Sequence, residues 1–233
     1  MPDIDLDSEL LDYIVRSGAR PGDRLPTINE LQEKHLGLSI SKVREQLEVA
    51  RALGFVEVRS KTGMKMKDYA FTPAVRLSLF YALALDLHYF ELFTALRNHI
   101  EAAYWLEACD TLTEEDLQIM RECVTSAWTK LNGQTVRIPN EEHRRFHMTM
   151  FTHLDNPFVT GILEAYWDAY NAVEITRYAD YAYHQEVWEY HERILDALAA
   201  RQFEQAKELF IKHTCLIRFS PNGRGDTPAR EYE

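Results

Sequence analysis

The sequence has few cysteines and no long apolar run, and both shortages limit what it can encode. Its three cysteines, Cys109, Cys123 and Cys215, form neither the CxxC pairs of a zinc ribbon nor the even count of a disulfide framework, so we expect reduced structural thiols. No segment offers about 18 uncharged apolar residues, and the acidic start MPDIDLDSELL lacks the basic and apolar parts of a secretory signal. We therefore predict a soluble, cytoplasmic chain with no membrane partner.

The charge of the chain is unevenly distributed. A net charge of −11 argues against a nucleic-acid partner only if it is spread evenly, because phosphate repels acidic surface. Residues 13–67, however, hold 11 Lys/Arg against 6 Asp/Glu, a net charge of +5, whereas residues 68–233 carry −11. With 233 residues, 46% of them hydrophobic, the chain exceeds the usual size of one domain. We predict a basic domain over 1–70, an acidic domain over 71–220 and a polar tail over 221–233.

The basic segment carries the start and stop signals of short helices. Apolar residues at helical spacing over residues 10–15 predict a first helix, and the glycines and proline that follow end it. Thr27, with Glu30 three residues later, is a capping box that opens a second helix through about residue 35. Ser39 or Ser41 can cap a third helix. Two short helices joined by a tight turn predict a helix-turn-helix.

The third predicted helix is followed by two short alternating segments. Val43, Leu47 and Ala50 form its buried stripe, and Gly54 ends it. Residues 55–58 and 64–67 then alternate like strands around a turn, which predicts a hairpin wing. Such a helix reads base edges with its N-terminal side chains while the wing touches phosphates. The candidate DNA-contacting residues are Thr27, Ser39, Ser41, Lys42, Arg44 and Gly63. The alternative for the two cations among them is an ordinary solvated helix face.

The run ARPGDRLPTINEL, then LGLSISKVREQL, then LGFVEVRSKTG resembles the winged-helix domain of the GntR family of bacterial transcriptional regulators. The matching positions are Pro21, Gly22, Leu25, Pro26, Glu30, Leu31, Ser39, Val43, Arg44, Glu45, Leu47, Gly54, Val56 and Gly63. Asn29 and Ile40 stand where that family usually has arginines that touch DNA, whereas Arg44 keeps its place. The resemblance implies a regulator that binds operator DNA.

The remainder of the chain is predicted to be helical throughout. After Pro73 only Pro139 and Pro157 precede Pro221, and apolar residues recur at intervals of three and four. We expect a bundle of helices over residues 74–86, 89–108, 113–131, 140–154, 157–178, 183–200 and 202–217. Thr113 and Asn140 are the caps that the sequence suggests for two of them. The predicted fold class is therefore mostly α, with a small β-hairpin wing.

Four histidines share the inward faces of three predicted helices. His143 and His147 are one turn apart, and His191 and His213 each lie on an apolar face. Four imidazoles that enter a bundle core from three helices can converge on one transition-metal ion. Taken singly, each is more often a core histidine hydrogen-bonded to a carbonyl. The other histidines, His35, His88, His99, His153 and His184, lack the pattern and are interpreted as surface or packing residues.

These segments resemble the FCD domain, the helical ligand-binding domain of the FadR subfamily of GntR regulators. The elements that match are Arg97 with Glu101, HRRFHMTM with Asn156-Pro157, His191 with the apolar run after it, and Ala206 with His213. The resemblance implies metal ligands at His143, His147, His191 and His213. His143 stands where the family usually has Asp, and an all-nitrogen set favours zinc or nickel over magnesium, calcium or manganese.

The resemblance also implies a small organic acid as effector. Arg97 is the candidate for its carboxylate, because a guanidinium binds carboxylates bidentately, and Glu101 is assigned to the same site. The alternative for Arg97 is a structural pair with Glu101 at i+4. Four further residues could reach the pocket, namely Arg145, Tyr170, Asn171 and Arg177.

The function that follows is a homodimeric transcriptional regulator, a repressor by the habit of the family, whose two recognition helices lie about 34 Å apart on the operator. Two other classes of function stay open at this stage. One is a metalloenzyme with a four-histidine site, which the absence of HExxH or paired ExxH motifs disfavours. The other is an architectural DNA-binding protein that needs no metal. We expect a protein that is not an enzyme.

Overall fold

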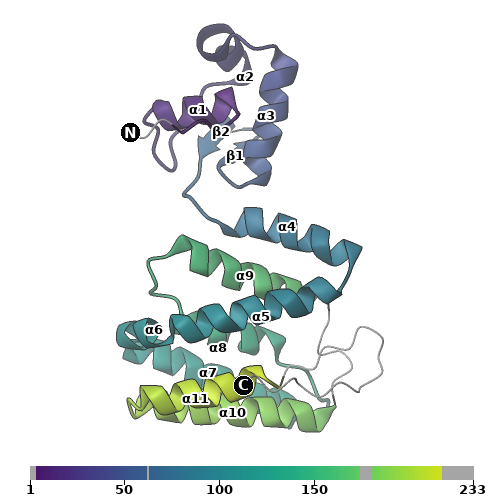
Figure 1. The fold of residues 1–233 in the computed structure, drawn as a ribbon, viewed down its shortest axis with the longest axis vertical. Helices are drawn as coiled ribbons and strands as arrows, with labels where there is room; N and C mark the ends of the chain where they lie inside the picture. The colour runs from purple at the N-terminus through teal and green to yellow at the C-terminus, as the bar shows by residue number, and fades with distance from the viewer. Residues whose placement is uncertain (1–3, 62, 174–179, 217–233) are drawn as a thin grey trace. The chain divides into compact units, whose positions relative to one another are not determined.

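The computed structural model describes residues 4–61, 63–173 and 180–216, and the chain divides into two compact units, Met1–Val75 and Arg76–Glu233. The predicted fold class is confirmed: the structure is mostly helical, with one two-stranded antiparallel hairpin among the described residues (Figure 1). The predicted polar tail, 221–233, lies outside the described residues.

Three helical segments lie in the described part of the first unit, and the second and third begin at caps that the sequence predicts. Helix α1, Glu9–Arg16, is capped by Ser8. Helix α2, Ile28–Glu30, has the predicted capping box, because the side chains of Thr27 and Glu30 each accept the other's backbone N–H. It continues directly as a π-helical stretch, Leu31–Leu36. Helix α3, Ile40–Ala52, is capped by Ser39, whose hydroxyl accepts the backbone N–H of Lys42. A single hydroxyl cap contributes about 1 kcal/mol to helix stability.

The core of the first unit contains the predicted stripe of α3 and one polar residue that the pattern does not reveal. Val43, Leu47 and Ala50 are buried as expected. Gln46 is also buried, and its Oε1 accepts the backbone N–H of Leu10 at 2.9 Å. Because that N–H lies in the first turn of α1, the amide side chain satisfies a donor that the helix itself leaves unpaired. The side chain of Gln46 therefore links α3 to the N-terminus of α1 by a hydrogen bond.

The predicted wing is an antiparallel hairpin of β1, Val56–Arg59, and β2, Gly63–Met66. Val56 pairs with Met66 and Arg59 with Gly63. Gly63 has a φ of +75°, a left-handed conformation that glycine adopts without steric cost. The backbone N–H of Leu25 bonds to the carbonyl of Met64 at 2.9 Å, which attaches the hairpin to the segment before α2.

Eight helices follow in the described part of the chain, and together they are called the helical domain. Their bounds are α4, Thr72–Leu85; α5, His88–Ala103; α6, Trp105–Thr111; α7, Glu114–Leu131; α8, Asn140–Met150; α9, Pro157–Ala172; α10, Tyr181–Ala199; and α11, Phe203–Thr214. Helix α10 packs against α11 and α7, α7 against α8, and α5 against α9. None of the helices in the described ranges is long and apolar enough to cross a membrane.

Two sequence predictions about these helices are wrong. The sequence predicts a single helix over 89–108, but the structure has two helices that are separated at Tyr104. The turn there places Trp105 fully in the core, where its Nε1–H donates to the carbonyl of Phe203 at 3.0 Å. Asn140 does not cap α8: it is the first residue of that helix, and Pro139 holds the cap position without a side-chain bond. The cap predicted at Thr113 is confirmed as a capping box with Asp116.

Candidate metal and effector site

Four histidine side chains from three helices meet in the core of the helical domain. His143 and His147 come from α8, His191 from α10 and His213 from α11, and each is at most 5% exposed. The Nε2 atom of His213 lies 3.5 Å from that of His143 and 3.3 Å from that of His147, and the Nε2 atoms of His147 and His191 are 3.2 Å apart. The structure thus brings together the four residues that helical periodicity placed on inward faces.

These spacings match those of a metal site. Four nitrogens bonded tetrahedrally to zinc at about 2.0–2.1 Å lie roughly 3.3 Å from one another. One ligand atom from each of the four histidines lies within 4.8 Å of the others. No other group of three or more histidine, cysteine or acidic side chains in the described ranges shows such a clustering. The donor set and its spacing fit a transition-metal ion.

The four imidazoles are neutral, as ligands must be. Burial lowers the pKa of His143, His147 and His213 well below the usual 6.5, and the neighbouring histidines and Arg97 add to the effect. Burial also lowers the pKa of His191 to about 3, although the hydrogen bond to Val187 opposes it. A neutral imidazole keeps a lone pair on one ring nitrogen, so no proton has to be displaced from these groups by a cation.

Hydrogen bonds determine which nitrogen of two rings carries the proton. The carbonyl of Val187 can only accept, so His191 donates its Nδ1–H at 2.7 Å and presents an Nε2 lone pair to the cluster. Arg97 can only donate, so the Nδ1 of His147, 2.8 Å from Nη2, accepts and the proton of that ring lies on Nε2. Glu101 Oε1 is 3.5 Å from the same Nδ1.

Arg97 and Glu101 form a fully buried ion pair on α5 beside the cluster. Arg97 Nε lies 2.7 Å from Glu101 Oε2, and Nη1 donates to Asn98 at 3.1 Å. The i+4 pairing considered for Arg97 is therefore present, and the guanidinium also reaches a candidate metal ligand. Burial raises the pKa of Glu101 to about 7, against the lowering influence of Arg97. The guanidinium also stacks over the ring of Tyr166, 4.7 Å from its centre.

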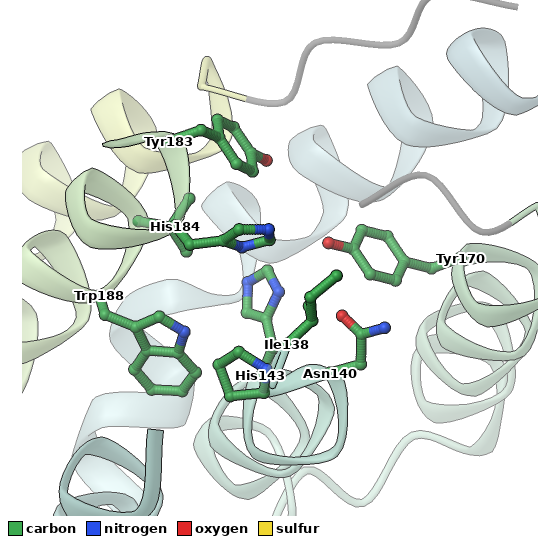
Figure 2. A pocket seen from close by; sticks show the side chains of 9 residues that line it. Ile138, Asn140, His143, Tyr170, Tyr183, His184 and Trp188 are labelled. Atoms are coloured by element: carbon green, nitrogen blue, oxygen red, sulfur yellow. The ribbon is translucent and has the colours of Figure 1, made fainter. Parts of the chain in front are cut away.

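A pocket opens beside the cluster (Figure 2). It is a shallow, partly open hollow whose water-sized space is about 10 Å³. Its lining residues are Ile138, Pro139, Asn140, His143, Tyr170, Tyr183, His184, Val187 and Trp188. His143 is thus both a member of the histidine cluster and part of the pocket wall.

The sequence predicted the pocket walls only in part. Tyr170 lines the pocket, but Arg145 and Asn171 are exposed and do not, and Arg177 lies outside the described residues. His184, interpreted as a surface or packing residue, is 5% exposed and lines the pocket. Its position seven residues before His191 on the same helix, two turns away on the same face, is the signal that could have found it.

The structure places the candidate DNA-contacting residues at two helix N-termini, on α3 and on the wing. Thr27 and Ser39 cap α2 and α3, so their hydroxyls hold the N-termini of these helices. Ser41 and Arg44 are exposed on α3, and Lys42, also exposed, pairs with Glu45 at 2.9 Å. Gly63 begins β2. The exposed first turns of α3 carry side chains that can reach base edges.

A helix-turn-helix with a hairpin wing, joined in one chain to a helical domain, is the architecture of a class of DNA-binding regulators. The model of the FCD domain matches residues 91–214, and the chain belongs to the FCD-domain family. It is a transcriptional regulator and not an enzyme: the curated relatives it matches are HTH-type transcriptional regulators, and a solved structure of the same fold is a GntR protein.

Three relatives illustrate the similarity. The chain is 27% identical over 90% of its length, and 86% of the relative's, to an uncharacterized HTH-type transcriptional regulator, YcbG, of Bacillus subtilis. It is 24% identical to the HTH-type transcriptional regulator LutR of the same organism, over 83% of this chain and 89% of that one. Among solved structures, a Streptococcus agalactiae GntR protein has the same fold, with a TM-score of 0.59 and 20% identity over 89% of this chain and 94% of that one.

Proposed function

We propose that this chain is a cytoplasmic, homodimeric repressor of the FadR subfamily, whose affinity for operator DNA is controlled by a small carboxylate bound beside a histidine-held metal ion. The observation that carries the proposal is the meeting of four buried, neutral imidazoles at ligand spacing next to a pocket and a buried guanidinium. The subfamily assignment rests on the FCD domain itself.

His143, His147, His191 and His213 would hold the metal. Four nitrogen donors without a carboxylate suit zinc or nickel rather than magnesium or manganese. When bound, the ion would supply positive charge, and it could take a carboxylate oxygen only by expanding its coordination beyond the four histidines. Trp167 supports an anionic effector here, because its buried Nε1–H has no hydrogen-bond partner in the described part of the chain and its ring centre lies 4.8 Å from that of His143.

Ligation through Nε2 requires His147 to change the position of its proton. With the lone pair on Nε2 the proton lies on Nδ1, which can then no longer accept from Arg97. Glu101 Oε1, 3.5 Å from that Nδ1 and without a hydrogen bond of its own in the described residues, is the acceptor that takes over. A carboxylate that orients a ligating histidine is the usual second partner in such sites. Arg97 Nη2 is then released to bind the effector carboxylate.

Operator binding is assigned to the first unit. Ser39, Ser41, Lys42 and Arg44 at the start of α3 would read the major groove, with Thr27 at the neighbouring helix end and the Gly63 wing on the phosphates. Two copies would place two such helices about 34 Å apart on a pseudo-palindromic site. The effector then acts only through unequal affinity for the DNA-competent and DNA-incompetent arrangements of the dimer.

The second copy is proposed to cover an apolar face of α4 and α5. Large apolar side chains are exposed along these two helices, namely Leu77, Tyr81, Leu85, Tyr89, Leu92 and Leu96. Contiguous exposed apolar surface marks interaction sites, and regulators of the GntR type are typically dimeric. A Leu92→Glu variant should shift the chain from dimer to monomer in analytical ultracentrifugation, and a chain that is monomeric before the change would contradict the assignment.

Metal analysis of the purified chain tests the central claim. We expect close to one zinc or nickel ion per chain by elemental analysis, and its loss in a His213→Ala variant. His153→Ala is the matched control, since His153 is paired with Asp116 away from the cluster. Operator binding measured with metal, with chelator, and with a panel of organic acids should respond to an acid only in the metal-loaded protein. A wild-type chain that binds no metal, or an acid response that survives chelation, would refute the proposal.

A further inference from the structure

Strand β2 of the wing has a second neighbour besides β1, namely the segment that precedes α2. Two backbone hydrogen bonds, of 2.9 and 3.0 Å, join residues 23–25 to residues 64–66. Between these bonds Arg24 stands directly opposite Lys65 in an antiparallel bridge. In a pair that its backbone bonds flank in this way, the two side chains point to the same face at the closer of the two antiparallel spacings. Arg24 and Lys65 are therefore close neighbours on the outer face of the wing.

These two opposed side chains are both cations, and neither forms an ion pair with a carboxylate in the described part of the chain. The acidic residue opposite Lys65 on the other side is Glu57. Its Oε1, however, lies 2.7 Å from Nε and 2.6 Å from Nη2 of Arg59, so this carboxylate is already engaged by a guanidinium. Like charges directly opposite each other destabilise a strand pair. The free chain therefore carries a local repulsion that an anion would relieve.

The guanidinium of Arg24 also lies against the glycine of the wing. A Cβ atom at Gly63 would come within 3.3 Å of Nε and 3.4 Å of Nη2 of Arg24. Arg24 is exposed and Lys65 is half-buried, so a ligand can reach both from solvent. The planar fork of an arginine matches the oxygens of a phosphate, and a lysine adds a point charge beside it. The geometry and the charge of this face suit a phosphate.

We propose that Arg24 and Lys65 form an anchor for the phosphate backbone of operator DNA, separate from the side chains at the start of α3 that would read bases. The inference rests on the proposed function, in which the first unit binds the operator. Bound phosphates turn the repulsion between the two cations into two favourable contacts. Contacts of this kind fix the position of a protein on the duplex, carry no sequence information, and weaken as salt rises.

Two duplexes of about 30 base pairs test the anchor: one that the wild-type full chain selects from a random-sequence library, and one with the same bases scrambled. Arg24→Gln should bind both about five- to tenfold more weakly at 0.1 M salt, and the slope of log affinity against log salt should become shallower by about one. Lys65→Gln should do the same, and the double variant should lose about two. Arg121→Gln removes an exposed cation of α7 in the helical domain and should change neither affinity nor slope.

Two further measurements separate an anchor from a structural role. Arg24→Lys keeps the charge and should keep the slope, and Arg24→Gln should unfold in urea at a midpoint no lower than that of the wild type, because the repulsion is gone. An unchanged slope in Arg24→Gln, a loss confined to the selected duplex, or a lower urea midpoint would each overturn the anchor and leave operator binding intact. A wild-type chain that binds neither duplex would refute both the anchor and the proposed operator binding.

Discussion

The metal-free chain should lose stability as the pH falls from 7 to 5.5, because its four clustered histidines stay neutral when folded. Their folded-state pKa values lie below the unfolded value of 6.5, so the unfolded chain binds more protons as the pH drops below 6.5. Between pH 7 and 5.5 each buried histidine costs about 1 kcal/mol of unfolding free energy, and the four together about 4–5 kcal/mol.

Glu101 acts in the opposite direction. Its pKa is raised to about 7 in the folded state against 4.5 when unfolded, so its destabilising contribution shrinks as the pH falls. Over the same interval the smaller penalty from Glu101 restores about 1–2 kcal/mol, which leaves a net loss of about 3 kcal/mol. Domains are typically stable by only about 5–15 kcal/mol, so the effect is large enough to measure by denaturant unfolding.

Two variants separate this cause from general acid sensitivity. Replacing one clustered histidine, as in His213→Gln, should reduce the loss of stability between pH 7 and 5.5 by about 1 kcal/mol, since glutamine does not titrate. His99→Gln, at an exposed histidine on α5, should leave the loss unchanged. The reasoning is refuted if the metal-free wild type is as stable at pH 5.5 as at pH 7, or if both variants behave alike.

Three further predictions concern the first unit. Arg44→Ala should lose about 1–3 kcal/mol of operator affinity in a binding assay yet keep the thermal stabilisation by zinc, and a loss of both would show that the two units do not act separately. Gly63→Ala should cost about 1–2 kcal/mol in denaturant unfolding, since φ is +75° and the new methyl group meets Arg24 at 3.3 Å, and no cost would exclude that strain. Gln46→Leu removes the acceptor of the Leu10 N–H and should destabilise the chain by about 1–3 kcal/mol, whereas a neutral effect would contradict the assigned bond.

Much of the architecture follows from short-range sequence signals. The capping boxes at Thr27 and Thr113 and the hairpin pairing of β1 with β2 depend on hydrogen bonds and sterics within a few residues, and the structure confirms these local elements. The inward direction of His143 and His147 likewise follows from helical periodicity alone. Local geometry of this kind is determined before any helix meets another.

The tertiary structure decided which of these faces meet. The convergence of α8, α10 and α11 places His213 within 3.5 Å of residues some 70 positions earlier, and this depends on how whole helices fill space against each other. The same packing explains why the chain turns at Tyr104 and buries Trp105. It also places His184 in the pocket wall and Arg97 in contact with both Glu101 and His147. Periodicity tells only which side of a helix is buried, whereas the partner across the core is determined by the volumes and polar groups of segments distant in sequence.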